Sequence, residues 1–531
     1  MYSSLFPRAG AFLHRVRAYL HATAAGPVPS ARAHRLAAMA GMALAAVTAG
    51  CASLNPRPDI ERSAEAVERA IGVRADAIAR DDDVAETTTR ELFADGLTAD
   101  EAVQFALLNN PRIRSAMLSI GVSRADFVQS TLYSNPSIFL SFRLPDGGGR
   151  SNVEFNLAQS IAELWLVPAR KEAAQRDLDR TVLNAAQTTA GIVWDVRQAY
   201  VQAAQAESIV ELGDVGLRIS LDLVEMAELR QRAGSGSEVD VNLAKSQRLQ
   251  SEINYRNARL AMIQAKAALC ELLGHTGDPE KLSLADKLSP PSIQNVTADH
   301  LQEIARAARL DVQAMDQAIA SAEALARLER VKFLRSVDLG FAFELAERRT
   351  RGNRNWLAET YYNSAQSNAL TPPNFMPQSS QNVTNTIAGP TISMELPILD
   401  QNQAQIAKAD RVLEQTRRLR DTLLVSVAQD IYAGLAKART AAENARFYHD
   451  EFVPTADRSV SLAKEGYRIG RVPFLSLLEA QRAYLTTRGA ELGALRDAAI
   501  ADIELERVTG RPASDFNAES GDATDAEGQA S

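Results

Sequence analysis

The residues that could do chemistry are carboxylates set into apolar, alternating stretches. In SVDLGFAFEL (336–345), large apolar residues occupy every second position, and Asp338 and Glu344 fall between them. Glu154 and Glu395 have the same setting in NVEFNLA and TISMELPIL. Carboxylates on one side of such stretches can attract cations from water, whereas their apolar neighbours favour a non-aqueous surrounding.

The sequence contains no pattern typical of an enzyme, a nucleotide site or a resident metal. The motifs HExxH, GxxxxGK, CxxC and GxSxG are absent. Beyond residue 51 the histidines are His275, His300 and His449, which are far apart in the chain. We therefore expect no catalytic activity, no cofactor and no metal site. Energy for any transport would have to come from a partner.

Four short β-strands must position the carboxylates, at about 137–144, 152–158, 336–345 and 391–396. The first two flank the turn sequence PDGGG and so predict a hairpin. Because side chains alternate between the two faces of a strand, one face is apolar and the other polar. The apolar set is Ile138, Leu140, Phe142, Val153, Phe155, Leu157, Val337, Leu339, Phe341, Phe343, Leu345, Ile392, Met394 and Leu396. The polar set is Ser141, Arg143, Asn152, Glu154, Asn156, Asp338, Glu344, Ser393 and Glu395.

Two strand pairs cannot close into a barrel, and an isolated hairpin is only marginally stable. Three copies that each contribute four strands would form one twelve-stranded β-barrel with its apolar face toward lipid. Four acids, Glu154, Asp338, Glu344 and Glu395, and one base, Arg143, would then face the lumen and mildly favour cations. The alternative is an ordinary sheet that packs on the rest of the protein, with its carboxylates in solvent.

Most of the remaining chain is expected to be helical. Apolar residues recur at a spacing of roughly 3.5 residues over about 161–232, as they do in coiled coils. Further helices are expected over about 239–273, 298–332 and 401–468, and a last one ends at VTG (508–510). Around one axis such helices would form a tube. The predicted fold is therefore mainly α, with a membrane β-barrel part.

The two halves of the sequence are related to each other. Gly234 and Gly470 are 236 residues apart, and the glycines that end the two returning helices keep the same spacing. Upstream the offset is only 199, and a polar insertion over 346–389 accounts for nearly all of the difference. An internal duplication explains this spacing, with one repeat over 96–296 and a second over 297–512.

The first 50 residues are typical of a secretory signal, with five arginines, no acids and a short apolar run before VTAGC. VTAGC resembles a bacterial lipobox, in which Cys51 is lipidated and becomes the new N-terminus, and Ala52 favours the outer membrane. The alternative is an ordinary signal peptide. Residues 51–95 are expected to form a lipidated polar tether with one short helix, and 513–531 a disordered acidic tail. The acidic balance of the chain argues against a nucleic-acid partner.

Several stretches, in their order along the chain, resemble the TolC-like outer-membrane efflux proteins. They are LTADEAVQFALLNNPRIRSA, LYSNPSIFLSF, RAGSGSEVDV, GPTISMELPILD and YRIGRVPFLSLLEAQRAYL, and the resemblance covers about 97–511. It implies a homotrimeric channel-tunnel, a passive exit duct for drugs, metal ions or other small molecules. An inner-membrane pump would drive export through a periplasmic adaptor. The duct would be lipid-anchored in the outer membrane, with a helical tunnel in the periplasm.

In that family two turns form a closed periplasmic tip, which contacts the adaptor and dilates when the pump complex assembles. The resemblance maps these turns to residues 233–240 and 469–478. It assigns the tip and adaptor contacts to Gly234, Gly236, Asp240, Gly470, Arg471, Val472 and Pro473. Some members narrow the tip with acidic rings, which makes Asp240 and Glu479 gate candidates, although Ser476 stands where the first acid would be. The alternatives are that the glycines only end helices and that Glu479 is a solvated surface residue.

A second function fits part of the same sequence: a lipid-anchored periplasmic adaptor or scaffold of helical hairpins without its own pore. This hypothesis explains the helices and Cys51, but it leaves the four alternating strands unexplained. A third alternative, an enzyme with an unfamiliar site, has no supporting motif.

Overall fold

The computed structural model describes residues 54–73, 96–143, 152–289, 296–350, 356–370, 372 and 381–517. The chain divides into two compact units, residues 1–54 and Asn55–Ser531. Every helix and strand with assigned bounds lies in the second unit. The expected signal peptide, Cys51, and most of the expected tether and tail lie outside the described residues.

The second unit is built from two runs of helices, each interrupted by a pair of strands. The first run is α3 (Arg57–Ile71), α5 (Ala99–Asn109), α6 (Pro111–Thr131), β1 (Ser137–Arg143), β2 (Asn152–Ser160), α7 (Glu163–Arg232), α8 (Glu238–Leu273) and η2 (Pro279–Lys281). The second begins with α9 (Ala298–Ala308), α10 (Leu310–Val331), η3 (Lys332–Leu334), β3 (Val337–Thr350), α11 (Trp356–Ser367) and β4 (Gln381–Met394). It ends with α12 (Gln403–Phe447), the π-helical η4 (Tyr448–Phe452), α13 (Val453–Arg468), α14 (Phe474–Thr509) and η5 (Ala513–Asn517).

Corresponding elements of the two runs have matching lengths and spacing. Helices α8 and α14 each have 36 residues, and their bounds differ by 236 at both ends. Helices α5 and α9 each have 11 residues, and their bounds differ by 199. These two offsets are the same as those between the glycines and upstream segments of the sequence.

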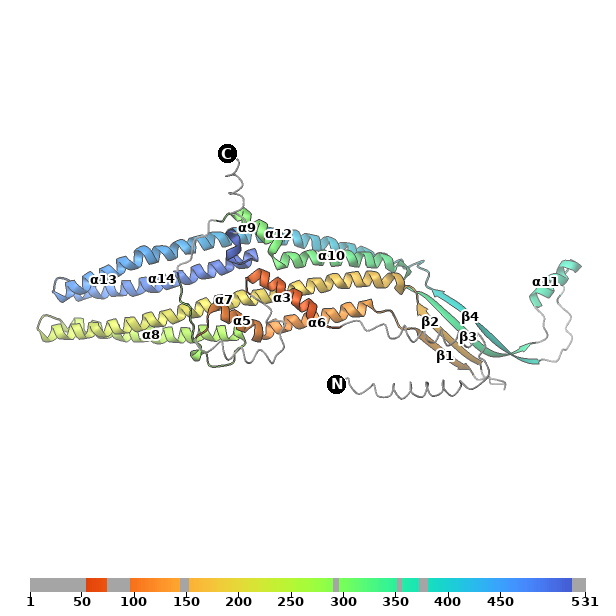
Figure 1. Ribbon diagram of the computed structural model, residues 1–531, viewed down its shortest axis with the longest axis horizontal. Helices are drawn as coiled ribbons and strands as arrows, with labels where there is room; N and C mark the ends of the chain where they lie inside the picture. The colour runs from red at the N-terminus through yellow and green to blue at the C-terminus, as the bar shows by residue number, and fades with distance from the viewer. Residues whose placement is uncertain are drawn as a thin grey trace, which may run out of the picture. The chain divides into compact units, whose positions relative to one another are not determined.

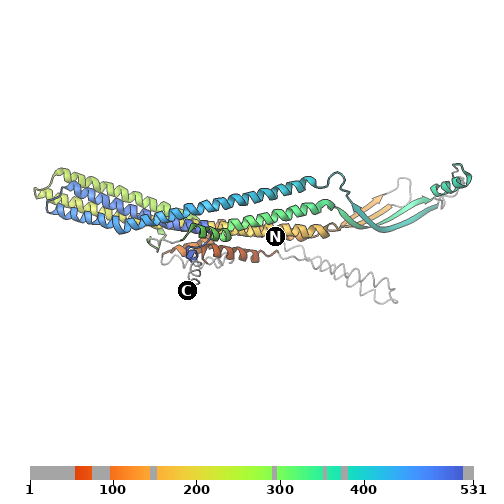
Figure 2. The ribbon, with the colours of Figure 1, turned by 90° about the horizontal axis from the view of Figure 1, so that it is seen from above.

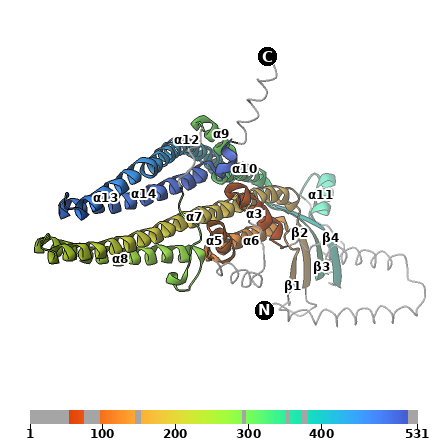
Figure 3. The same cartoon turned by 60° about the vertical axis from the view of Figure 1, so that its left-hand side comes forward.

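The long helices pack as two hairpins that lie side by side, α7 with α8 and α13 with α14 (Figure 1). Figure 2 and Figure 3 show that the turns of both hairpins lie at the same end, whereas the strands continue from the other end of α7. Helix α7 alone has 70 residues, which corresponds to about 105 Å at the α-helical rise.

The main core lies where α5, α7 and α8 meet, and α7 supplies much of it. The buried residues of α7, in this core and beyond it, keep the spacing of the expected coiled-coil pattern. They include Leu178, Val182, Ala185, Thr189, Val193, Val196 and Tyr200, each at most 4% exposed. The predicted helix over about 161–232 is therefore confirmed, together with the face that it buries.

The expected tether is partly wrong, because α3 belongs to the helical body. Val67 and Ile71 of α3 are at most 1% exposed, and both belong to the main core. Besides these two larger residues, the buried face of α3 contains three alanines and the polar residues Asp59 and Ser63. Such a weak apolar pattern lies within a polar sequence, which is why the sequence suggested only a short helix on a tether.

The strands of the second pair are longer than expected. Strand β3 continues to Thr350 instead of ending near 345, and β4 begins at Gln381 instead of about 391. The polar insertion therefore begins and ends with a two-stranded extension of the sheet, and α11 lies in the connection between these strands (Figure 1). These extensions lack apolar alternation in the sequence, and their backbone pairing defines them as strands.

Two predicted helices are interrupted. The run expected over 298–332 breaks at Arg309, whose extended backbone separates α9 from α10. The run expected over 401–468 passes through η4, a single π-helical turn. Within the described ranges, no helix combines the length and the apolarity that crossing a membrane requires.

Candidate functional site: a two-faced sheet and a helical tip

The four strands form one antiparallel sheet in the order β1-β2-β3-β4. Its register aligns apolar residues from all four strands in rows. One row joins Leu140, Phe155 and Phe343, and a neighbouring row joins Ile138, Leu157 and Phe341. Because paired residues point to the same face, every strand member of the predicted apolar set lies on one face. Leu396 of that set lies beyond the end of β4.

This apolar face carries large side chains that the chain itself does not cover. Ile138 is 68% exposed, Phe142 65% and Ile392 73%. A soluble sheet that packs on a helical body would bury such residues, at a gain of roughly 1.5–3 kcal/mol each. The exposure therefore contradicts the alternative of an ordinary packed sheet, and it requires another apolar phase or a partner on this face.

The opposite face contains the expected polar set. Glu154 of β2 pairs directly with Glu344 of β3, so two carboxylates from the two halves of the chain are cross-strand neighbours. Arg143 Nη2 lies 3.4 Å from Glu154 Oε2. Phe139 and Ile387 lie on the same face, as their pairing with Asn156 and Glu344 shows. The polar face is therefore mixed rather than uniformly hydrophilic.

Glu395 differs from its expected place in a strand. Strand β4 ends at Met394, and Glu395 continues the ladder only by donating its backbone N–H to the Ser336 carbonyl oxygen at 3.3 Å. Its carboxylate lies 3.9 Å from Arg335 Nε. The excess of acid that the sequence suggested for this face is therefore partly offset at the end next to the helices.

The two hairpin turns lie at the far end of the helices, and a glycine in the left-handed region makes each turn. Gly234 has φ 73° and Gly470 has φ 79°. A side chain at these angles would strain the backbone, so glycine is favoured at both positions, whether it serves the turn or only ends the helix. A Cβ on Gly236 would lie 2.8 Å from the Gln231 nitrogen, so that turn also needs glycine for space.

One arginine joins the two turns. Arg230 Nη1 donates to the Tyr467 carbonyl oxygen at 2.6 Å, and its Cζ lies 4.6 Å from the centroid of the Tyr467 ring. Arg230 Nη2 also donates to the Ser235 carbonyl oxygen at 3.3 Å. Tyr467 is 3% exposed, and burial raises the pKa of its phenol. This contact was not predicted, because the position 236 residues after Arg230, where a repeat would place a second arginine, is Gly466.

An apolar cluster lies directly behind this contact and draws on all four helices of the two hairpins. It contains Leu223, Ala227, Val241, Ala244, Tyr467, Phe474, Leu477 and Leu478. The Tyr467 and Phe474 rings meet edge to face, with centroids 5.6 Å apart. The turns are thus fastened to each other by packing as well as by Arg230.

The family model described as outer membrane efflux protein matches residues 102–275 and 301–511. These ranges include both hairpins and all four strands.

The chain belongs to the outer membrane efflux protein family.

Alignments with relatives of this efflux protein cover most of both chains. The cobalt-zinc-cadmium resistance protein CzcC of Cupriavidus metallidurans is 22% identical over 429 residues, which cover 78% of this chain and 90% of CzcC. The probable efflux pump outer membrane protein TtgC of Pseudomonas putida is 22% identical over 451 residues, which cover 80% of this chain and 85% of TtgC.

Solved structures show the same fold. CusC, from work on folding and transmembrane channel formation, has a TM-score of 0.59 at 16% identity, with coverage of 78% of this chain and 93% of CusC. The CmeC outer membrane channel of Campylobacter jejuni has a TM-score of 0.60 at 14% identity, with coverage of 80% and 88%.

The gate candidates of this efflux protein have local partners. Asp240 completes a capping box at the start of α8, where its carboxylate accepts the Ser237 backbone N–H at 3.4 Å. Glu479 forms an ion pair with Arg482, at 3.2 Å from Nη1. Among the described contacts, none joins Asp240 to Glu479. Arg471, Val472 and Pro473 lie in the turn itself, before α14 begins.

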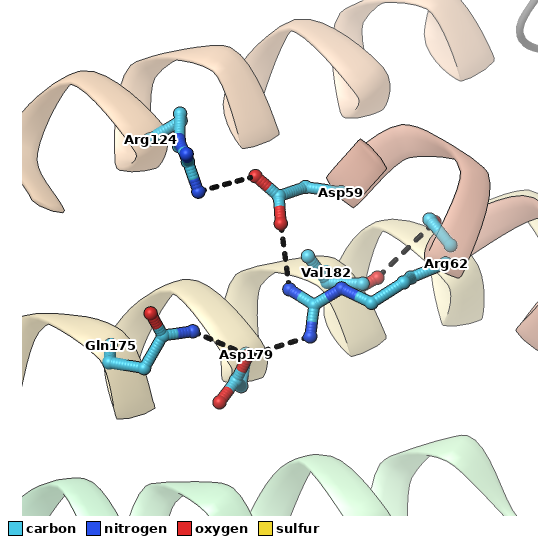
Figure 4. A network of polar contacts seen from close by, with 7 residues as sticks. Asp59, Arg62, Arg124, Gln175, Asp179 and Val182 are labelled. Atoms are coloured by element: carbon cyan, nitrogen blue, oxygen red, sulfur yellow. Dashed lines mark hydrogen bonds and ion pairs between the residues drawn. The ribbon is translucent and has the colours of Figure 1, made fainter. Parts of the chain in front are cut away.

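Polar contacts fix α3, the first described helix after Cys51, to the helical body (Figure 4). Asp59, 4% exposed, pairs with Arg62 of its own helix at 2.8 Å and with Arg124 of α6 at 3.4 Å. Arg62 also pairs with Asp179 of α7 at 2.9 Å. Ser63 Oγ donates to the Val182 carbonyl oxygen at 3.3 Å. This network was not predicted, because its members come from three separate helices.

Two acids of α14 are buried away from the tip. Burial raises the pKa of Asp502 to about 6, and the neighbouring charge of Glu506 adds to the effect. Burial also raises the pKa of Glu506, although Arg197 Nη1 donates to it at 2.8 Å. Across the described ranges, no group of three or more His, Cys, Asp or Glu residues could hold a metal ion.

Proposed function

We propose that this protein is the outer-membrane exit duct of a tripartite efflux system, through which solutes pass without energy input from the duct itself. The observation that carries the proposal is the two-faced sheet, with rows of exposed apolar side chains on one face and carboxylates on the other. Lipid suits the first face and a water-filled lumen suits the second.

The proposed duct is a homotrimer. A four-stranded sheet leaves two edges, β1 and β4, whose backbone groups need partners in lipid. Three copies that join β4 to the next β1 would close a twelve-stranded barrel without free edges. The matching helix lengths of the two halves support a duplicated chain, whose long hairpins would surround one periplasmic tunnel.

The hairpin turns are the proposed periplasmic tip and adaptor contact. They combine an exposed surface with a firmly packed interior, because the Tyr467 cluster lies behind them. The proposed contact residues are Gly234, Gly236, Asp240, Gly470, Arg471, Val472 and Pro473. An inner-membrane pump would supply the energy through the adaptor, and Asp240 and Glu479 stay gate candidates.

The direction of α3 supports lipidation at Cys51. Contacts of Ser63 with Val182 and of Arg197 with Ile71 make α3 run parallel to α7, so its first residue points toward the sheet. Cys51 precedes Arg57 by six residues, a reach of about 20 Å. Asp179, which pairs with Arg62, is 16 residues from the start of α7, or about 24 Å along that helix. The length of chain between Cys51 and α3 is therefore sufficient for a lipid on Cys51 to reach the leaflet next to the helices.

The proposed cargo leans toward cations, either metal ions or cationic drugs. The cross-strand pair Glu154 and Glu344 places two carboxylates beside one base, Arg143, on the proposed lumen face, and Arg335 offsets Glu395. CzcC is named for cobalt, zinc and cadmium resistance, and another relative in P. putida is a toluene efflux protein. The pump that feeds the duct would select among such cargoes.

Spin labels test the proposal directly. Labels at Phe155 and Phe341 should be accessible to oxygen in the bilayer, whereas labels at Glu154 and Glu344 should be accessible to a polar nickel reagent. Purified protein should also form pores in planar bilayers. The proposal would be wrong if the labels at Phe155 and Phe341 were packed against protein or exposed to water and the protein formed no pores. The periplasmic scaffold would then be the remaining hypothesis. In that case Cys51→Ala should release the protein from membranes, whereas a duct without its lipid stays in the outer membrane.

A further inference from the structure

Large apolar side chains are exposed where the two edge strands of the sheet join their helices. Tyr133, which precedes β1, is 55% exposed. After β4, Leu396 is 63% exposed, Ile398 73% and Leu399 91%. Exposed apolar groups of this size, placed at the two ends of one sheet, indicate surfaces that another molecule covers.

The segment after β4 also forms one wall of a cavity of about 580 Å³. Phe333 and Leu396–Leu399 line its apolar part, and Arg335 and Asp400 lie at its polar part. Arg335 Nη2 is 2.7 Å from Asp400 Oδ2. The cavity therefore combines an apolar floor with an ion pair that offers both a donor and an acceptor. An amphipathic aromatic ring such as tyrosine fits this combination.

Strand direction determines which residues would approach this cavity. Neighbouring strands are antiparallel throughout the sheet, so β4 of one copy would run antiparallel to β1 of the next. The start of β1 would then lie beside the end of β4. Tyr133, four residues before β1, would therefore approach the segment after β4 of the neighbouring copy.

The stepped edge of the sheet refines this position. Each strand reaches further toward the helices than the strand before it. Ser137, the first residue of β1, pairs with Ala158, but β2 continues to Ser160, which pairs with Asp338. Strand β3 begins one residue earlier, at Val337, which pairs with Met394. Such a stagger is required for strands that close into a barrel. Continuing it by one strand places Ser137 of the next copy near residues 395–396. Tyr133 of that copy, four residues further on, then lies level with residues 399–400, next to Ile398.

We propose that Tyr133 of one copy inserts into the cavity beside Phe333 and Leu396–Leu399 of the neighbouring copy. This inference rests on the trimer of the proposed function, and it adds the contact that would lock adjacent copies where strands meet helices. The interface is heterologous, because each copy supplies its tyrosine on one side and its cavity on the other. Three such contacts would close a ring.

A phospholipid chain is the competing occupant of the cavity, and the charges at the site disfavour it. A bound phosphate group needs an available cation, but Arg335 pairs with Asp400 and Lys332 Nζ lies 2.5 Å from Glu329 Oε1. Both cations that line the cavity therefore already have carboxylate partners. A neutral ring with one hydroxyl group can use these partners without displacing them.

Disulfide trapping tests the contact. Tyr133→Cys and Ile398→Cys would be made in separate, differently tagged copies, expressed together and oxidised in membranes. The native cysteines do not interfere, because Cys270 is 4% exposed and Cys51 is present in all variants. We expect a reducible dimer that contains both tags. The matched control pairs Leu118→Cys, which is 72% exposed on α6, with Ile398→Cys and should give none.

A second set of cysteines separates this inference from the trimer itself. Phe139→Cys of β1 would be combined in turn with Thr391→Cys, Ser393→Cys and Glu395→Cys, to detect pairing of β1 with β4 of another copy. Cross-links in this set without any at Tyr133 would overturn the inference and leave the trimer intact. No cross-links in either set would overturn both.

Thermal stability of the trimer supplies an independent measurement. Tyr133→Ala should lower the temperature at which trimers dissociate on semi-native gels by several degrees, and Leu118→Ala should not.

Native mass spectrometry reports the competing occupant. A phospholipid retained in equal amount by wild type and by Tyr133→Ala, with no change in trimer stability, would show that lipid rather than tyrosine fills the cavity.

Discussion

Arg230 at the end of α7 and Tyr467 at the end of α13 connect the two hairpin turns, through a 2.6 Å hydrogen bond and a ring contact at 4.6 Å. The two residues are 237 positions apart in the sequence and come from different repeats. Among the described contacts, this pair joins one turn of the proposed tip to the other and so restrains their separation.

Arg230→Ala should loosen the tip. The substitution removes a charged hydrogen bond and a cation–π contact, which together stabilise the closed arrangement by about 2–3 kcal/mol. We expect a larger single-channel conductance in planar bilayers with little change in the overall melting temperature. Arg232→Ala, an exposed residue of the same helix end, is the matched control. Equal conductance of both variants and wild type would mean that this link does not restrain the pore.

Alanine at Gly470 should destabilise the protein. At φ 79° a side chain clashes with its own backbone, which costs about 1–2 kcal/mol. Gly493→Ala is the control, because Gly493 lies inside α14 and a Cβ there has nothing within 4 Å. That change should be neutral or stabilising by up to about 1 kcal/mol. Thermal unfolding followed by circular dichroism measures both, and equal effects would contradict the strain at Gly470.

The stability of the helical body should fall as the pH rises toward neutrality. Burial raises the pKa of Asp502 from 3.8 to about 6, so in this window the folded chain keeps a proton that the unfolded chain loses. Above about pH 6 the folded chain must hold a buried charge. Asp502→Asn mimics the protonated form, so it should raise the melting temperature at pH 7.5 and flatten its pH dependence. Asp497→Asn, at an exposed ion pair, should leave the wild-type profile unchanged.

Loss of the Asp59 carboxylate should release α3 from the helical body. Asp59→Ala leaves Arg124 without its ion-pair partner on α3, at a cost of about 1–3 kcal/mol. Hydrogen exchange over residues 57–71 should become at least tenfold faster. Glu65→Ala, on the exposed side of the same helix, should preserve protection. If both variants exchange alike, the network in Figure 4 contributes nothing to the attachment of α3.

The charges of the gate candidates affect conductance only if they line the passage. We expect that they do, and therefore a higher single-channel conductance for Asp240→Ala combined with Glu479→Ala. Because Asp240 is also the N3 residue of the capping box that Ser237 begins, Asp240→Ala alone should lower stability by about 0.3–1.5 kcal/mol. Asp240→Ser retains a capping oxygen without the charge and separates the two effects. Unchanged conductance in the double variant would reject the gate assignment.

The sequence predicted those elements whose residues carry their own pattern. Alternation revealed the sheet around Phe155 and Phe341, and a 3.5-residue seam revealed α7, because burial on one face leaves a period in the sequence. Backbone pairing beyond residue 345 left no such mark, since the polar residues that form this ladder do not alternate with apolar ones. Arg230, Tyr467 and Asp59 could not be identified either, because their roles depend on which distant helices meet.

The uneven length of the two strand pairs has a practical consequence. Pairing of β1 with β2 ends at Arg143 and Asn152, whereas β3 and β4 remain paired as far as Thr350 and Gln381. Beyond the shorter pair, the longer one has no neighbouring strand within the described chain, and an isolated ribbon of this kind is only marginally stable. This projection and α11 at its end should open first in hydrogen exchange. In the proposed duct this projection would lie on the side of the barrel away from the helices, and an epitope inserted there should report from the cell exterior without disturbing the barrel wall.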